Sequence, residues 1–195
     1  MESRNETARI EGFSDAVFAI AITLLGLDLR VPPPGSQGLL AKVLAQWPEY
    51  LAFVASFGTI AVWWIMHHRL FTLIRRSNHA LLLLNCLVLL WVTVIPYPTR
   101  MVAAYVGTPD LRVAAMLHAA TFVMIAACFK LLWWYVSVHG HLLNPDVDAR
   151  TIRVINGMSS FAPLMYVVSL LLASVNVTVS ATLNLALAVF LAIPK

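Results

Sequence analysis

The sequence predicts an all-α, polytopic membrane protein with six transmembrane helices, because it combines high hydropathy, few charges and six separated apolar runs. Of its 195 residues, 61% are hydrophobic and only 11% are charged, and the mean hydropathy is +0.83. A soluble globular chain carries about a quarter charged residues, so a water-soluble domain is disfavoured. Backbone groups at membrane depth need partners within the chain, and this requirement favours helices.

Each of the six runs approaches the about 20 residues that a transmembrane helix needs. Helix-breaking and polar segments separate them: Pro32 to Gly35 ends the first, Arg75 to Asn78 precedes the third, and Pro96 and Pro98 close the third. The weakest division, between the fifth and sixth spans, is the mildly polar stretch Ser174 to Thr178. Instead of two spans, this part of the chain could form one helix followed by a re-entrant segment. We therefore treat 1–195 as one six-helix membrane domain, with approximate spans 11–30, 49–68, 79–97, 112–137, 154–173 and 175–193.

The distribution of basic residues predicts that both termini lie in the cytoplasm and that the protein resides in the cell membrane. With the N-terminus inside, nine of the 13 Lys and Arg residues fall on inner segments, in line with the positive-inside rule. The net charge of +4 is explained in this way, and no nucleic-acid partner is expected. Residues 36–47 are expected to form a short amphipathic helix on the outer side. The inner set is Arg4, Arg9, Arg69, Arg75, Arg76, Lys130, Arg150, Arg153 and Lys195; the outer set is Arg30, Lys42, Arg100 and Arg112.

Asp15 stands inside the first span, about one turn from its inner end. A charge at the centre of a membrane helix costs about 2.5–3.5 kcal/mol on insertion scales, so we expect a polar partner on another helix. Arg9 lies on a different face of the same helix, which argues against a direct pair. An aspartate hydrated by lipid headgroups is the alternative. The candidate partners are His67, His68, Arg69, Trp64 and Asn85.

A second feature of the first span is an apolar stripe. Ile20, Thr23, Leu24 and Leu27 are spaced i, i+3, i+4 and i+7, so they share one face of a helix. Such a stripe has two explanations: the residues pack against the other spans, or they line a pore.

The start of this span resembles a known family. Arg9, Phe13, Ser14 and Asp15, followed by Ala-Val-Phe-Ala-Ile-Ala-Ile-Thr, resemble the R-x-x-x-F-S-D motif of the transmembrane-protein-175 potassium channels in their short prokaryotic form. Trp64-x-x-His67-His68 and Pro96-Tyr97-Pro98-Thr99 fit the same family. The likeness covers about half of the chain, and the last three spans match in hydropathy more than in motif.

The resemblance implies a homotetrameric, potassium-selective channel whose pore is lined by the first helix of each subunit. By position, Ile20 would form the narrowest hydrophobic ring, Leu24 and Leu27 further apolar layers, and Thr23 the hydroxyl layer that favours potassium. The family pore has no carbonyl-lined filter. Neither a cofactor nor a bound metal is implied, and potassium is the permeant ion. The polar network that holds the pore helix would comprise Arg9, Phe13, Ser14, Asp15, Trp64, His68 and Asn85.

The residues themselves agree with several of these implications. One helix cannot surround a channel, so a pore lined by it requires several copies about an axis, and a ring of Ile or Leu can gate by dewetting. No T-V-G-Y-G segment is present, and beyond Arg112 at its first position the fourth span carries only Lys130 rather than a series of arginines.

Other functions remain as alternatives. A cation- or proton-coupled secondary transporter would use Asp15 and a histidine of the second span, but Pro163 has no counterpart in the other half of the chain. An enzyme is not expected, because polar residues do not converge at one depth. A non-conducting scaffold is compatible with the composition. The His67-His68 pair does not repeat a recognised metal-ligand spacing. Cys86 and Cys128 are interpreted as buried apolar residues.

Overall fold

The computed structural model describes residues 7–33 and 38–192, and over these ranges the chain forms helices, turns and a single isolated bridge between Ile74 and Leu143. The predicted all-α class is confirmed. Expectations that fall on Arg4, on residues 34–37 and on residues 193–195 lie outside the described part. The helices are α1 (Ala8–Leu25), α2 (Leu39–Ala45), α3 (Trp47–Phe71), α4 (His79–Val94), α5 (Pro96–Ala104), α6 (Leu111–Val138), α7 (Ala149–Ala173) and α8 (Val177–Ala192), with short 3-10 helices at Gly26–Asp28 and Gly140–Leu142.

Four helical segments are long and apolar enough to cross a membrane: Trp47–Phe71, His79–Ala104, Leu111–Val138 and Ala149–Ala173. The chain is therefore a multi-pass membrane protein. The apolar helix Val177–Leu191 is shorter, and α1 carries Arg9, Glu11 and Asp15 near its start. By length and composition alone, α1 and α8 are therefore not among the four segments that could cross a membrane.

The third expected span differs from the structure at its end. Pro96 and Pro98 do not close it, because Pro96 is the first residue of α5, which continues to Ala104. Proline is tolerated at this position, since the first N–H groups of a helix have no partner within it. The prolines therefore start a new helix in nearly the same direction rather than a loop.

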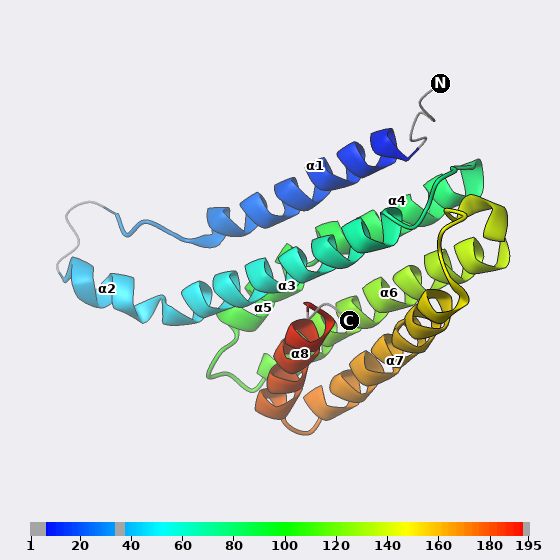
Figure 1. Cartoon of the computed structure of the whole chain (residues 1–195). Coiled ribbons are helices and arrows are strands. Elements are labelled where there is room, and N and C mark those ends of the chain that lie inside the picture. Colours follow the sequence, from blue (N-terminus) through cyan, green and yellow to red (C-terminus); the bar gives the residue numbers. More distant parts are fainter. Residues whose placement is uncertain (1–6, 34–37, 193–195) are drawn as a thin grey trace.

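The helices form a bundle in which α1 lies along one side (Figure 1). It contacts α3, α4 and α5, whereas α6 packs against α7 and α4. The expected break between the last two spans falls at Ser174 to Asn176, and the helices on either side of it, α7 and α8, pack against each other. Only one side of α1 is therefore covered by its own protomer.

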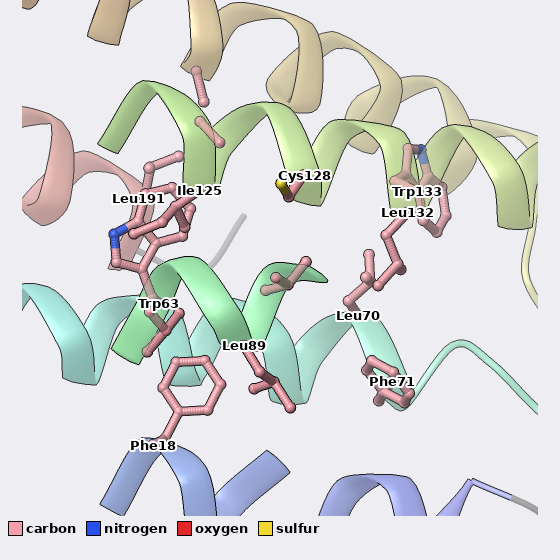
Figure 2. Packing of buried hydrophobic residues seen from close by; sticks show 14 of the residues in the cluster. Phe18, Trp63, Leu70, Phe71, Leu89, Ile125, Cys128, Leu132, Trp133 and Leu191 are labelled. Carbon is pink, nitrogen blue, oxygen red and sulfur yellow. The ribbon is translucent and has the colours of Figure 1, made fainter. Parts of the chain in front are cut away.

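The core lies between α3, α4, α6 and α7 (Figure 2). Trp63 stacks on Phe129 with ring centroids 5.2 Å apart and lies 5.8 Å from the ring of Tyr166. Phe18 is the largest side chain that α1 inserts into this core, and it is 1% exposed. In a bilayer such contacts stabilise the bundle through close packing more than through exclusion of water.

The two cysteines have different surroundings. Both are free thiols, and Cys128 is buried as predicted. The prediction for Cys86 was wrong, because this residue is exposed. It lies on α4 between the exposed leucines Leu83 and Leu87, on a face that the rest of the protomer leaves open.

Several basic residues of the inner and outer sets lie at opposite ends of the bundle. The start of α1 and the connections α3–α4 and α6–α7 share one end, while the α5–α6 connection and the α7–α8 turn share the other (Figure 1). Arg75, Arg76 and Arg150 belong to the first end, and Arg112 belongs to the second. The bundle thus separates these four residues in the way that the sequence predicted.

Two buried serines join α7 to α8. The hydroxyl oxygens of Ser169 and Ser180 lie 2.9 Å apart, and the Ser180 hydroxyl lies 2.9 Å from the backbone oxygen of Ser169. We expect Ser180→Ala to lower the free energy of unfolding by about 0.6–1.7 kcal/mol, the range for hydrogen bonds between membrane helices. Thermal unfolding in detergent measures the change, with Ser174→Ala as control, because Ser174 bonds within its own helix. Equal melting temperatures of S180A and the wild type would contradict the expectation.

Candidate functional site

The first helix has a buried face and an open face. Ile10, Ser14, Phe18, Ala21 and Leu25 are buried and recur every three or four residues. The open face includes Ile20, which is 57% exposed, Leu24, at 42%, and Leu27 just beyond the helix, at 77%. The apolar stripe identified in the sequence therefore points away from its own protomer.

A chain of three buried polar side chains anchors the N-terminal half of α1. The Ser14 hydroxyl donates to the Ile10 carbonyl at 2.7 Å and accepts a hydrogen bond from Asn85 Nδ2 at 3.0 Å. Asn85 Oδ1 lies 2.8 Å from His67 Nε2. Because a carbonyl oxygen only accepts, His67 Nε2 carries the proton. Each polar group in this chain is thus paired, as burial requires.

Aromatic rings fix the position of His67. Its ring stacks on Phe71 at 4.4 Å, and it meets the edges of Phe18 at 5.5 Å and Phe129 at 6.3 Å. His67 is 1% exposed. Residues of α1, α3 and α6 therefore surround one imidazole, whose polar contact goes to α4.

Asp15 has a separate partner on α3. Trp64 Nε1 donates to Asp15 Oδ1 at 2.7 Å, a hydrogen bond strengthened by the charge of the carboxylate. Both residues are exposed. This bond lies on another side of α1 from the Ser14 contact, so the two together restrict rotation of the helix about its own axis.

The structure brings together some of the predicted network residues and leaves others apart. Ser14 with Asn85, and Asp15 with Trp64, form the contacts just described. His68, expected in the network, is exposed and stacks on Trp64 at 6.2 Å. The hydrogen bond to Asn85 comes instead from His67, which the sequence suggested only as a candidate partner of Asp15.

A pattern in the sequence distinguishes the two histidines. Consecutive residues differ by about 100° around a helix, so only one of the pair can face the core. Ser56, Ile60, Trp63, His67 and Leu70 recur at helical spacing, and all five are buried. Following this stripe from Trp63 to Leu70 would have selected His67.

Arg9 and Phe13 lie outside this network. Arg9 is exposed, and within residues 7–33 and 38–192 it has no hydrogen-bond or ion-pair partner. Phe13 is 57% exposed and shares the open side of α1 with Ile20. One protomer alone therefore gives neither residue a buried polar contact.

Thr23 lies in the C-terminal half of α1 and is exposed. Its hydroxyl donates to the Ile20 carbonyl at 3.0 Å. Because a hydroxyl has one proton and two acceptor lone pairs, the oxygen of Thr23 keeps acceptor capacity toward the open face.

The described residues contain no group of three or more His, Cys, Asp and Glu side chains suited to a metal ion. The polar groups of Ser14, Asn85 and His67, and those of Asp15 and Trp64, are engaged in hydrogen bonds with one another. The open face of α1 is therefore the feature that needs a functional explanation.

Comparison with known proteins identifies the group to which this architecture belongs. The family described as "Endosomal/lysosomal potassium channel TMEM175" matches residues 9–96. A protein named as a potassium channel in Chamaesiphon minutus is 40% identical over 193 residues, which cover 97% of this chain and 95% of the relative. The chain belongs to the TMEM175 family. The predicted family membership is confirmed.

Two further relatives agree. A protein named as a potassium channel in Streptomyces collinus is 42% identical over 174 residues, covering 88% of this chain and 84% of that protein. The crystal structure of a lysosomal potassium-selective channel TMEM175 homolog from Chamaesiphon minutus superposes with a TM-score of 0.86 at 40% identity, covering 97% of both chains. These relatives are named as channels, which confirms the expectation that the chain is not an enzyme.

Replacing Asn85 with leucine tests the anchor of α1. Asn85→Leu removes the partners of Ser14 and His67 but keeps the approximate volume of the side chain. A buried group left unpaired costs about 1–3 kcal/mol, so we expect a lower melting temperature in detergent. Thr93→Leu is the control, because exposed Thr93 on the same helix bonds only to Leu90 of its own turn. Equal melting temperatures for N85L and T93L would show that the anchor contributes little.

Proposed function

We propose that the chain assembles as a homotetrameric, potassium-selective channel whose pore is lined by α1 of each subunit. The observation that carries the proposal is the open apolar face of α1, with Ile20 and Leu24 exposed while Phe18 and Leu25 on the opposite face are buried. A single copy of such a face encloses nothing. Several copies related by rotation about an axis would enclose a path between them.

The polar anchor supports this assignment because it determines which residues face the axis. The bonds Ser14–Asn85 and Asp15–Trp64 hold α1 on α4 and α3. With these contacts in place, Ile20 and Leu24 point away from the protomer. The network therefore has a positioning role for the lining residues rather than a direct role in conduction.

Ile20 is proposed as the narrowest ring, followed by Leu24 and Leu27 toward the outer side. Four branched apolar side chains around one axis make a constriction that water leaves readily, and ion passage stops when the constriction is dry. Gating then requires only a change in the diameter or hydration of this ring.

Thr23 is proposed as the selectivity layer. A potassium ion that loses part of its hydration shell requires oxygen ligands, and the Thr23 hydroxyl retains acceptor lone pairs beyond its bond to Ile20. The helix α1 runs from Ala8 to Leu25, so its carbonyls are engaged in helical hydrogen bonds. Side chains rather than a carbonyl-type filter would therefore line this pore.

The proposal includes six membrane crossings with both termini in the cytoplasm. At about 1.5 Å per residue, the 18 residues of α1 span about 27 Å and the 16 of α8 about 24 Å, near the hydrocarbon thickness of about 30 Å. In an assembly, α1 would face other subunits and the pore, so its charged start would not meet lipid tails. The end bearing Arg75, Arg76 and Arg150 would face the cytoplasm of the cell.

The channel accounts for the site better than a coupled transporter does. Asp15 bonds to Trp64 and His67 faces Asn85, so the aspartate–histidine pair that such a transporter would use is not formed between these side chains. The relatives named above are potassium channels. No cofactor is required, and the partners are identical subunits, the lipid bilayer and potassium ions.

Ile20→Asn tests the constriction. An amide ring holds water where isoleucine excludes it, so we expect potassium leak from protein-loaded liposomes to rise severalfold over the wild type. Leu171→Asn is the matched control, because Leu171 is exposed on α7, away from α1. Unchanged potassium flux in I20N, or the same rise in L171N, would argue against Ile20 as the gate.

Thr23→Val tests the selectivity layer. Valine has nearly the shape of threonine but lacks the oxygen, so we expect the preference for potassium over sodium to fall severalfold while conduction persists. Reversal potentials under a potassium–sodium gradient measure this preference. Thr93→Val, at an exposed position of α4, is the control. An unaltered ratio in T23V would place selectivity elsewhere.

A further inference from the structure

A basic cavity lies at the end of the bundle that contains the start of α1. It has a volume of about 420 Å³ and is formed between the α3–α4 and α6–α7 connections. These connections meet at one end of the bundle (Figure 1). Five polar residues line it: Arg75, Arg76, Ser137, His141 and Asn144. The cavity is remote from the open face of α1 and has no part in the proposed pore.

Backbone hydrogen bonds hold the two connections together. The N–H groups of Arg75 and Arg76 donate to the Leu142 carbonyl at 2.8 and 3.2 Å. In return, the Asn144 N–H donates to the Leu73 carbonyl at 2.9 Å, and its side-chain amide donates to the Thr72 carbonyl at 2.8 Å. The cavity is therefore preformed, since its walls need no rearrangement to face a ligand.

The charge of the lining is positive and uncompensated. Arg75 and Arg76 are exposed, and across the part of the chain that the structure describes their side chains have no carboxylate partner. Asp146 and Asp148 belong to the same connection but do not line the cavity. The Asp148 carboxylate accepts a hydrogen bond from the Thr151 N–H at 2.7 Å, which caps α7. Hydrogen bonding to the side chain of Thr151, and then to its backbone, lowers the pKa of Asp148. That carboxylate is thus occupied elsewhere.

Nearby aromatic residues place the cavity at the level of the lipid headgroups. Trp134 is 57% exposed near the end of α6, and exposed tryptophans concentrate at the membrane–water interface. Ser137, one turn later on the same helix, lines the cavity. Its opening is therefore close to the headgroup layer.

We propose that this cavity binds the phosphate group of an anionic lipid of the phosphatidylglycerol type. Two guanidinium groups can each bind phosphate oxygens with paired hydrogen bonds, and Asn144 and His141 add further polar contacts. Basic pockets at the cytoplasmic ends of membrane helices suit lipid headgroups. A soluble phosphate compound has the same chemistry, but a ligand held in the adjoining bilayer is present at much higher local concentration.

The experiment measures binding to the full-length purified protein in detergent. A fluorescent short-chain phosphatidylglycerol is the probe, and its anisotropy is followed while unlabelled phosphatidylglycerol, phosphatidylcholine or inorganic phosphate competes. The variants are R75Q/R76Q and, as matched control, R153Q, which removes one positive charge at the same end of the bundle but outside the cavity. Val147→Trp, which narrows the cavity without altering charge, is a second variant. Elution profiles verify that each variant is folded.

We expect R75Q/R76Q to weaken binding about tenfold or more, the effect of losing one or two charged hydrogen bonds. V147W should also weaken it, and R153Q should bind like the wild type. Equal affinities of R75Q/R76Q and the wild type, or an equal loss in R153Q, would overturn the proposal. If phosphatidylcholine competes as strongly as phosphatidylglycerol, the cavity does not recognise the net charge of the lipid. If inorganic phosphate competes as strongly as phosphatidylglycerol, the assignment of a lipid ligand is overturned. The readout involves no ion flux, so it is independent of the channel proposal.

Discussion

The hydrogen-bonded chain from Ser14 through Asn85 to His67 is the interaction on which the functional geometry depends. Each of these polar groups is buried, and each would be costly if its partner moved away. The first helix is therefore held in one rotational position, with Phe18 and Leu25 inward. The outward orientation of Ile20, Thr23 and Leu24 follows from contacts made elsewhere on the helix.

Much of the candidate site was predictable because α1 combines a motif with a simple period. The apolar stripe, the need of Asp15 for a partner and the candidate Trp64 follow from helical spacing and from the cost of charge in a membrane. Asn85, expected as another candidate partner of Asp15, bonds to Ser14 and His67 instead. The choice between His67 and His68 depended on which side of α3 faces the core. That side is visible only when the apolar residues of α3 are followed over several turns.

Other features depended on information that local sequence does not hold. Pro96 and Pro98 signal a break, but whether the chain turns or starts a new helix depends on how α5 packs against α3 and α6. The exposure of Cys86 likewise depends on which face of a largely apolar helix is covered. Arg9 and Phe13 have no buried contact within one protomer, because the residues that could meet them are not determined by the fold of a single chain.

The anchor of α1 also bears on how the protein is made. Ser14 and Asn85 are 71 positions apart, and Asp15 and Trp64 are 49 apart. During synthesis the leading helix emerges with its carboxylates before either partner has left the ribosome. Its final rotation is consequently settled only after the third apolar segment has entered the bilayer, so α1 reaches its native orientation well after it has been synthesised.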